Sequence, residues 1–95
     1  MSTLVGQQID HYRIDALLGE GGMGSVFRAY DLNLARPVAL KVMHPQFANQ
    51  PEFQRRFMQE AQAAARLDHP SIVKIYNFGL SQRFFYMVME VVAGA

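Results

Sequence analysis

The stretch GEGGMG, residues 19–24, contains four glycines in six residues and could bind phosphate groups. Because glycine lacks a Cβ atom, its backbone amides can approach a phosphate closely. A tight hairpin needs only about two residues with special backbone geometry, and extra glycines weaken strand pairing. The glycines therefore favour a phosphate-binding loop, while a flexible hairpin without a ligand is the simpler alternative.

Two kinds of nucleotide-binding loop share the spacing of Gly19, Gly21 and Gly24. In dinucleotide-binding folds the loop runs from a strand into a helix, whose N-terminus receives the pyrophosphate. Here the following residues alternate with the two-residue period of a strand. One face would carry Val26, Arg28 and Tyr30, and the other Phe27 and Ala29. The loop thus joins two strands, and the Gly-Lys pair of a P-loop does not occur.

Two charged residues lie on surfaces that are otherwise apolar. Lys41 lies within VALKVM, and a buried ammonium group needs a partner. Glu60 lies on a helical stripe with Phe53 and Phe57, which should face the sheet. Taken singly, each side chain could reach water from an edge or a margin. Taken together, they predict an ion pair between a strand and the helix.

The sequence pattern predicts five strands and one helix, in the order β-β-β-α-β-β. The expected strands are residues 12–18, 25–30, 37–43, 72–78 and 84–90, the helix is 51–67, and the turns include 31–36 and 79–83. Pro51 and Glu52 suit the first turn of a helix. Because the connections are short, we expect an antiparallel sheet with the helix packed on it, an α+β fold.

The composition limits the function further. Nine Lys and Arg residues oppose eight Asp and Glu, which argues against a broad surface for nucleic acid or an anionic membrane. The absence of cysteine excludes disulfides and thiolate metal sites and fits the reducing cytoplasm. No segment resembles a membrane span or a signal peptide. His11, His44 and His69 lack metal-ligand spacing.

These features together resemble the N-terminal, ATP-binding lobe of protein kinases. The pattern GxGxxGxV ends at Val26, the VAIK-type strand is Val38–Lys41 with leucine in place of isoleucine, and Glu60 matches the helix glutamate. Residues Tyr86–Gly94 resemble the fifth strand and the hinge. The residues of the glycine loop and of the segment AAARLDHP are most similar to those of bacterial, Hanks-type serine/threonine kinases. The resemblance covers about Ile9–Gly94.

The resemblance implies how the phosphates of ATP would be bound. The glycine loop would cover them with backbone amides, Lys41 would contact the α- and β-phosphates, and Glu60 would hold Lys41 in place. Neither residue would be catalytic in the strict sense, since they form a supporting ion pair. The magnesium ligands and the catalytic base would belong to a C-terminal lobe, because the sequence contains no HRD or DFG motif.

The resemblance also implies how adenine would be bound. Val26 and Ala39 would form a small apolar ceiling over the ring, and Met89 would be the gatekeeper, with ordinary core packing as its alternative role. The Glu90 carbonyl and the Val92 amide would bind the edge of adenine. The complete set of expected ATP-binding residues is Leu18, Gly19, Glu20, Gly21, Gly22, Met23, Gly24, Val26, Ala39, Lys41, Glu60, Met89, Glu90 and Val92.

We therefore expect residues 1–95 to be one partial domain, a kinase N-lobe that transfers no phosphate alone and binds ATP weakly. Its partners would be ATP, the C-lobe and, in the complete kinase, protein substrates. Apolar residues near Met89, Val91 and Val92 predict self-association when no C-lobe covers them. The alternative function is a dimerisation or regulatory module without chemistry, although such a module has no need of Lys41 and Glu60.

Overall fold

The computed structural model describes residues 4–21, 24–44, 49–66, 75–81 and 84–91, with only the backbone described for residues 60–66. The elements in chain order are β1 (Gln8–Ile9), β2 (Tyr12–Glu20), β3 (Gly24–Asp31), β4 (Arg36–Met43), α2 (Pro51–Arg66), β5 (Ile75–Ser81) and β6 (Phe84–Met89). Residue 67 of the predicted helix and residues 72–74 of the predicted fourth strand lie outside the described part of the chain.

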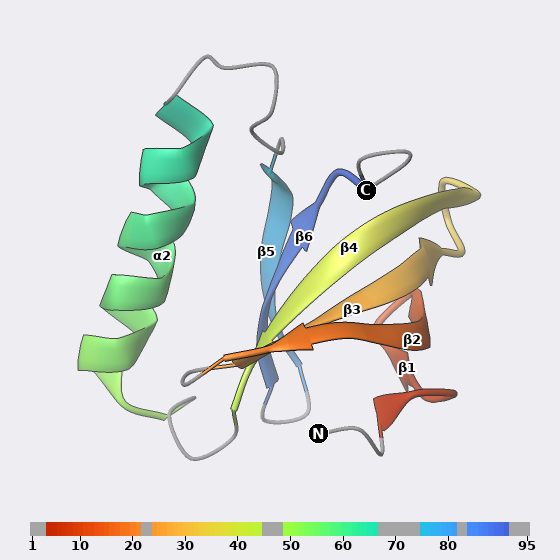
Figure 1. Ribbon diagram of the computed structural model, residues 1–95, viewed down its shortest axis with the longest axis horizontal. Coiled ribbons are helices and arrows are strands. Elements are labelled where there is room, and N and C mark those ends of the chain that lie inside the picture. The colour runs from red at the N-terminus through yellow and green to blue at the C-terminus, as the bar shows by residue number, and fades with distance from the viewer. Residues whose placement is uncertain (1–3, 22–23, 45–48, 67–74, 82–83, 92–95) are drawn as a thin grey trace.

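The strands form one antiparallel sheet in the order β1-β2-β3-β4-β6-β5, and α2 lies against its β5–β6 side (Figure 1). This arrangement confirms the predicted α+β fold. The sheet has one strand more than expected, because β1 contains only two residues and is too short to show an alternating pattern. Strands β2 and β3 also extend into the glycine-rich stretch, which leaves a shorter loop between them.

The predicted turn over residues 31–36 is confirmed for residues 32–35, since Asp31 ends β3 and Arg36 begins β4. The Asp31 side chain explains how the turn forms. The Asp31 Oδ1 atom accepts hydrogen bonds from the backbone N–H groups of Asn33 and Leu34, at 2.9 and 3.0 Å. Aspartate commonly closes turns in this way. Ala35 then adopts a positive φ of 53° before β4 begins. The turn therefore sets β3 directly beside β4, the strand that carries Lys41.

The predicted turn over residues 79–83 is wrong for its first three residues, because β5 continues to Ser81. Gly79 pairs with Tyr86 of β6. A Cβ atom on Gly79 would lie 2.3 Å from the Tyr86 ring, so the glycine is needed for close packing rather than for a turn.

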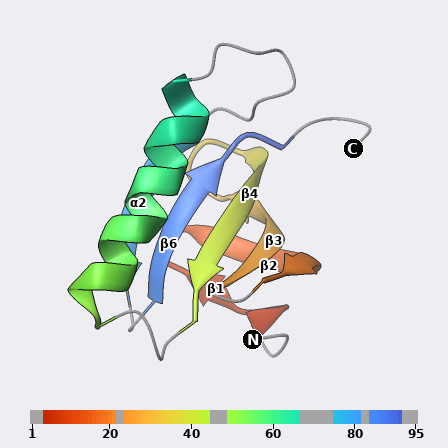
Figure 2. The same ribbon diagram turned by 60° about the vertical axis from the view of Figure 1, so that its left-hand side comes forward.

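The two faces of the sheet bury different apolar clusters. One face encloses a cluster that includes Ile14, Phe27 and Leu40, all fully buried. The opposite face packs against α2, where the Phe57 ring meets Phe85 edge-on with centroids 5.4 Å apart. Figure 2 shows α2 running alongside β6 on this side. Within the described residues, no helix is long and apolar enough to cross a membrane.

Candidate nucleotide site

Strand pairing brings several predicted site residues into two adjacent rows on the α2 side of the sheet. Residues paired across antiparallel strands share a face. The first row joins Gly19, Val26, Lys41 and Met87 across β2, β3, β4 and β6. The second row joins Ala16, Arg28, Ala39, Met89 and Ile75. The predicted phosphate contacts and the predicted adenine ceiling therefore lie side by side on one surface.

Lys41 lies where the covered part of this face meets the uncovered part. Its strand is buried as predicted, but Lys41 itself is half-buried. Its Nζ atom lies 5.3 Å from the centre of the Phe57 ring, so its side chain extends toward α2. Glu60 follows Phe57 by three residues, a spacing that puts both on one helix face. The Glu60 side chain lies outside the described residues, and the ion pair stays a prediction.

The C-terminal end of the glycine loop, at Gly24, lies close to β4. A Cβ atom on Gly24 would lie 2.4 Å from the Val42 carbonyl oxygen, so only glycine fits there without a shift of the backbone. The Gly21 N–H donates a 2.8 Å hydrogen bond to the Gly24 carbonyl. Residues 22 and 23 of the predicted site lie outside the described part of the chain. The loop backbone thus lies near the strand of Lys41.

The N-terminal part of the loop, at Gly19 and Gly21, leaves space for a ligand. A Cβ atom on Gly19 would meet no atom within 4 Å, and one on Gly21 would meet only the Gly24 carbonyl, at 3.9 Å. Leu18 and Glu20 are exposed on either side of Gly19, with 58% of Leu18 accessible. The open backbone, an apolar side chain and a nearby ammonium group fit the phosphates and ring of a nucleotide.

The predicted adenine side is described in part. Met89 pairs with Ala39 and Ile75, and it is partly buried against the cluster around Phe57. Ala39 is 8% exposed and leaves a low surface beside Lys41. Glu90 is half-buried, whereas Val92 lies outside the described residues. The gatekeeper and hinge roles stay predictions.

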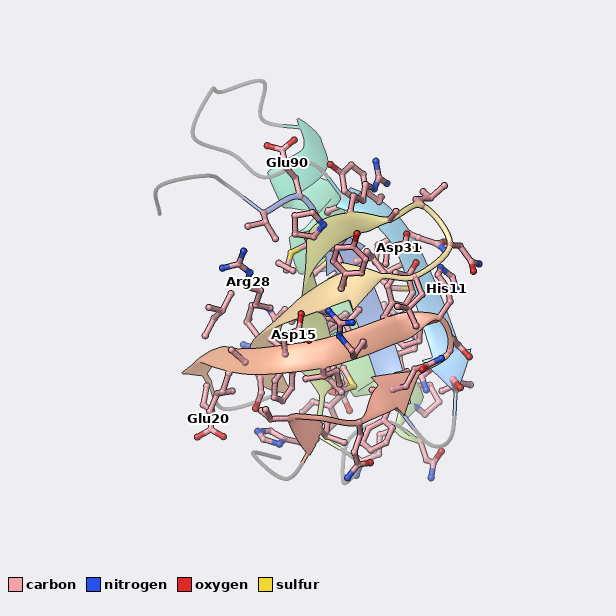
Figure 3. All side chains as sticks on the ribbon, turned by 90° about the vertical axis from the view of Figure 1, so that its right-hand side faces the viewer. His11, Asp15, Glu20, Arg28, Asp31 and Glu90 are labelled. Atoms are coloured by element: carbon pink, nitrogen blue, oxygen red, sulfur yellow. The ribbon has the colours of Figure 1, made fainter. Side chains whose placement is uncertain are left out.

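The polar residues at the far end of the strands are structural. Figure 3 shows Glu20, near the loop, at one end of β2 and His11 and Asp31 at the other. His11 Nε2 lies 3.7 Å from Asp31 Oδ1. Nearby, burial and the Asp31 carboxylate raise the pKa of the Tyr12 hydroxyl. These groups lie at the start of β2 and the end of β3, away from the candidate site.

The surface of α2 contains a cavity that is separate from the predicted site. This cavity of about 410 Å³ includes none of the predicted site residues; it is lined by Glu52, Phe53, Arg55, Arg56 and Gln59.

The structure also shows a contact to the glycine loop that the sequence does not predict. His44 Nε2 lies 3.3 Å from the Gly21 carbonyl oxygen. The two residues are 23 positions apart, so no local spacing in the sequence could indicate this contact.

The sequence profile of the protein kinase domain matches residues 12–95. The chain belongs to the protein kinase family. Among its relatives, the serine/threonine-protein kinase PrkC of Bacillus subtilis is 47% identical over 92 residues, which cover 96% of this chain and 14% of PrkC. The serine/threonine-protein kinase PknA of Mycobacterium tuberculosis is 43% identical over 100 residues, which cover 99% of this chain and 23% of PknA.

Solved kinase structures share the fold of this kinase chain. A mutant form of the Mycobacterium tuberculosis PknI kinase domain has a TM-score of 0.75 and 33% sequence identity, covering 99% of this chain and 38% of that domain. A structure described as PpkA-294, apo form, has a TM-score of 0.72 and 28% identity, covering 96% of this chain and 39% of that one. The predicted membership among bacterial serine/threonine kinases is confirmed, and the kinase chain matches the N-terminal part of that fold.

Proposed function

We propose that this chain binds ATP on the sheet face formed by β2, β3 and β4 and positions its phosphates for transfer to serine or threonine residues of proteins. The shared row of Gly19, Val26 and Lys41 supports this proposal most directly. It sets open loop backbone, an apolar residue and an ammonium group next to one another. The named relatives are serine/threonine kinases, which supports the proposed acceptor.

Each group has a separate task in the proposed complex. Backbone amides of the loop stabilise the negative phosphates, and the Lys41 ammonium neutralises charge on the α- and β-phosphates. The Glu60 carboxylate keeps Lys41 oriented. Val26 and Ala39 exclude water from one face of adenine, while Glu90 and Val92 offer backbone groups to its edge. Magnesium, when bound with ATP, supplies further charge neutralisation through ligands that this sequence does not include.

The experiment that tests the proposal is Lys41→Met in the full product of the gene, assayed with labelled ATP and a protein acceptor. We expect at least about a hundredfold loss of phosphotransfer, the cost typical of removing one transition-state charge contact. The matched control is Arg13→Met, because Arg13 is an exposed cation on β2 that pairs with Asp15 rather than with the loop. Exposed ion pairs contribute little to stability, so the control should keep its fold and activity.

Folding is measured in parallel by circular dichroism and thermal unfolding. If Lys41→Met folds normally and retains phosphotransfer, the proposed role of Lys41 is wrong. If phosphotransfer is lost although the biological output of the gene is unchanged, that output depends on the chain as a binding module rather than on phosphotransfer.

A further inference from the structure

His44 is the first residue after β4, the strand that carries Lys41. Its Nε2 atom lies 3.3 Å from the Gly21 carbonyl oxygen, within hydrogen-bond distance. A carbonyl oxygen only accepts, so the Nε2 atom must carry the hydrogen. This contact therefore requires either the Nε2–H tautomer or the protonated imidazole. It connects the end of β4 with Gly21, which lies on the β2 side of the glycine loop.

The loop is anchored unequally at its two ends. Gly24 belongs to β3 and pairs with Met43 of β4, and its backbone packs tightly on Val42. Gly21 lies beyond the end of β2, and the strand pairs of the described residues do not include it. Its described hydrogen bonds are the one that its N–H donates to Gly24 and the one that its carbonyl accepts from His44. His44 thus supplies the link from this end of the loop to the β4 side.

We propose that His44 is a positioning residue for nucleotide binding, which holds the glycine loop through the Gly21 carbonyl. This inference depends on the proposed function, since it assigns His44 to the same phosphate site. A glycine-rich backbone loses much conformational freedom when a ligand orders it. If the loop is already held in the free protein, less of that cost falls on the binding step. The effect should be confined to ligands whose phosphates contact the loop.

The test compares MgADP with adenosine in isothermal calorimetry on the full product of the gene. His44→Ala removes the donor, and we expect about two- to tenfold weaker MgADP binding, which is the range for one neutral hydrogen bond. Adenosine carries no phosphate and should bind with unchanged affinity. The KM for ATP should rise by the same factor as the MgADP dissociation constant, with kcat within about twofold of the unchanged enzyme.

Two conservative variants and one distant control sharpen the test. His44→Gln places an amide N–H near the position of Nε2 and should restore MgADP affinity, whereas His44→Asn reaches only as far as Nδ1 and should not. His11→Ala removes a histidine at the opposite end of the strands, where it contacts Asp31, and should leave MgADP affinity unchanged. Thermal unfolding of each variant verifies that it is folded.

The possible outcomes separate this inference from the proposed function. If His44→Ala binds MgADP with the same affinity as the wild-type protein, the inference about His44 is overturned, while the proposed function is not affected. Equal weakening of MgADP and adenosine also overturns it, because His44 would then support the fold in general. A His44→Gln variant that behaves like His44→Ala excludes the hydrogen bond as the cause. Failure of the unchanged protein to bind MgADP overturns the proposed function and this inference with it.

Discussion

Tyr86 shows how one side chain joins parts of the sheet that are far apart in the sequence. Its hydroxyl donates a hydrogen bond to the Asp10 carboxylate, and its ring meets Tyr12 edge-on at 5.8 Å. Burial, followed by the bond to Asp10, raises the pKa of Tyr86 above the ordinary value of 10.0. The folded chain therefore favours the protonated hydroxyl, and it becomes less stable at a pH high enough to deprotonate this group.

The sign of the pH effect follows from this raised pKa. Below pH 10 the hydroxyl is protonated in both folded and unfolded chains, so its full stabilising contribution is present. Above pH 10 the unfolded chain loses the proton first, and the contribution declines as the pH rises toward the folded pKa. We expect Tyr86→Phe to be about 1–2 kcal/mol less stable than the unchanged chain at pH 8, through loss of a hydrogen bond to a charged group.

This difference should shrink at pH 11. Urea denaturation of both proteins at the two pH values measures it, and effects of other titrating groups that are common to both proteins cancel in the comparison. A difference that stays constant or grows between pH 8 and pH 11 would contradict the assignment of a raised pKa to Tyr86.

Single residues differ in how far the sequence predicts their role. Lys41 could be singled out because an ammonium group among apolar neighbours is costly without a partner, and this cost is visible locally. Its place beside Phe57 agrees with that reasoning. The contacts of Tyr86 with Asp10 and of His44 with Gly21 join residues 76 and 23 positions apart. Tyrosine and histidine are ordinary in either position, so only the folded chain reveals these pairs.

Strand β5 is the element in which sequence and structure differ most clearly. Glycine followed by polar residues usually indicates a turn. Gly79 instead gives room to the Tyr86 ring of the paired strand, which the bond to Asp10 holds in place. The sequence predicts the helix more accurately, because the spacing of Phe53 and Phe57 depends only on local periodicity. Packing between strands has no such local signal.

Substituting two glycines in the same sheet tests this interpretation of β5. In Gly79→Ala the new methyl group would lie 2.3 Å from the Tyr86 ring, so we expect a loss of about 2–3 kcal/mol in the free energy of unfolding, as in overpacked cores. Gly19→Ala is the matched control, because its methyl group would meet no atom within 4 Å and its φ is not positive. Its stability should change by about 1 kcal/mol or less.

Chemical denaturation of the two variants beside the unchanged chain gives both values. Equal effects at the two positions would show that the Tyr86 ring moves aside easily, and the close packing of β5 on β6 would then not explain Gly79.

The whole molecule divides one sheet face between two tasks. Helix α2 covers the β5–β6 side, where Met87 and Phe85 pack against Phe57. The β2–β3 side carries Gly19 with open space above it and Val26 half-buried. The proposed nucleotide would lie on this open side, with Lys41 at the boundary. One face of a sheet provides one wall of a site, whereas nucleotide pockets normally bury most of their ligand.

We therefore expect the 95-residue chain alone to bind MgATP with a dissociation constant no tighter than roughly 100 μM, or about −5.5 kcal/mol. It should transfer no phosphate, because its sequence contains neither the HRD aspartate nor the DFG aspartate that kinases use for the acceptor and the metal. Calorimetry or an NMR titration measures the affinity, and labelled ATP with a protein acceptor measures transfer. Low-micromolar binding would mean that the β2–β4 face and the loop enclose the nucleotide far better than one wall can. Turnover by the pure chain would mean that the transfer needs neither the HRD aspartate nor the DFG aspartate.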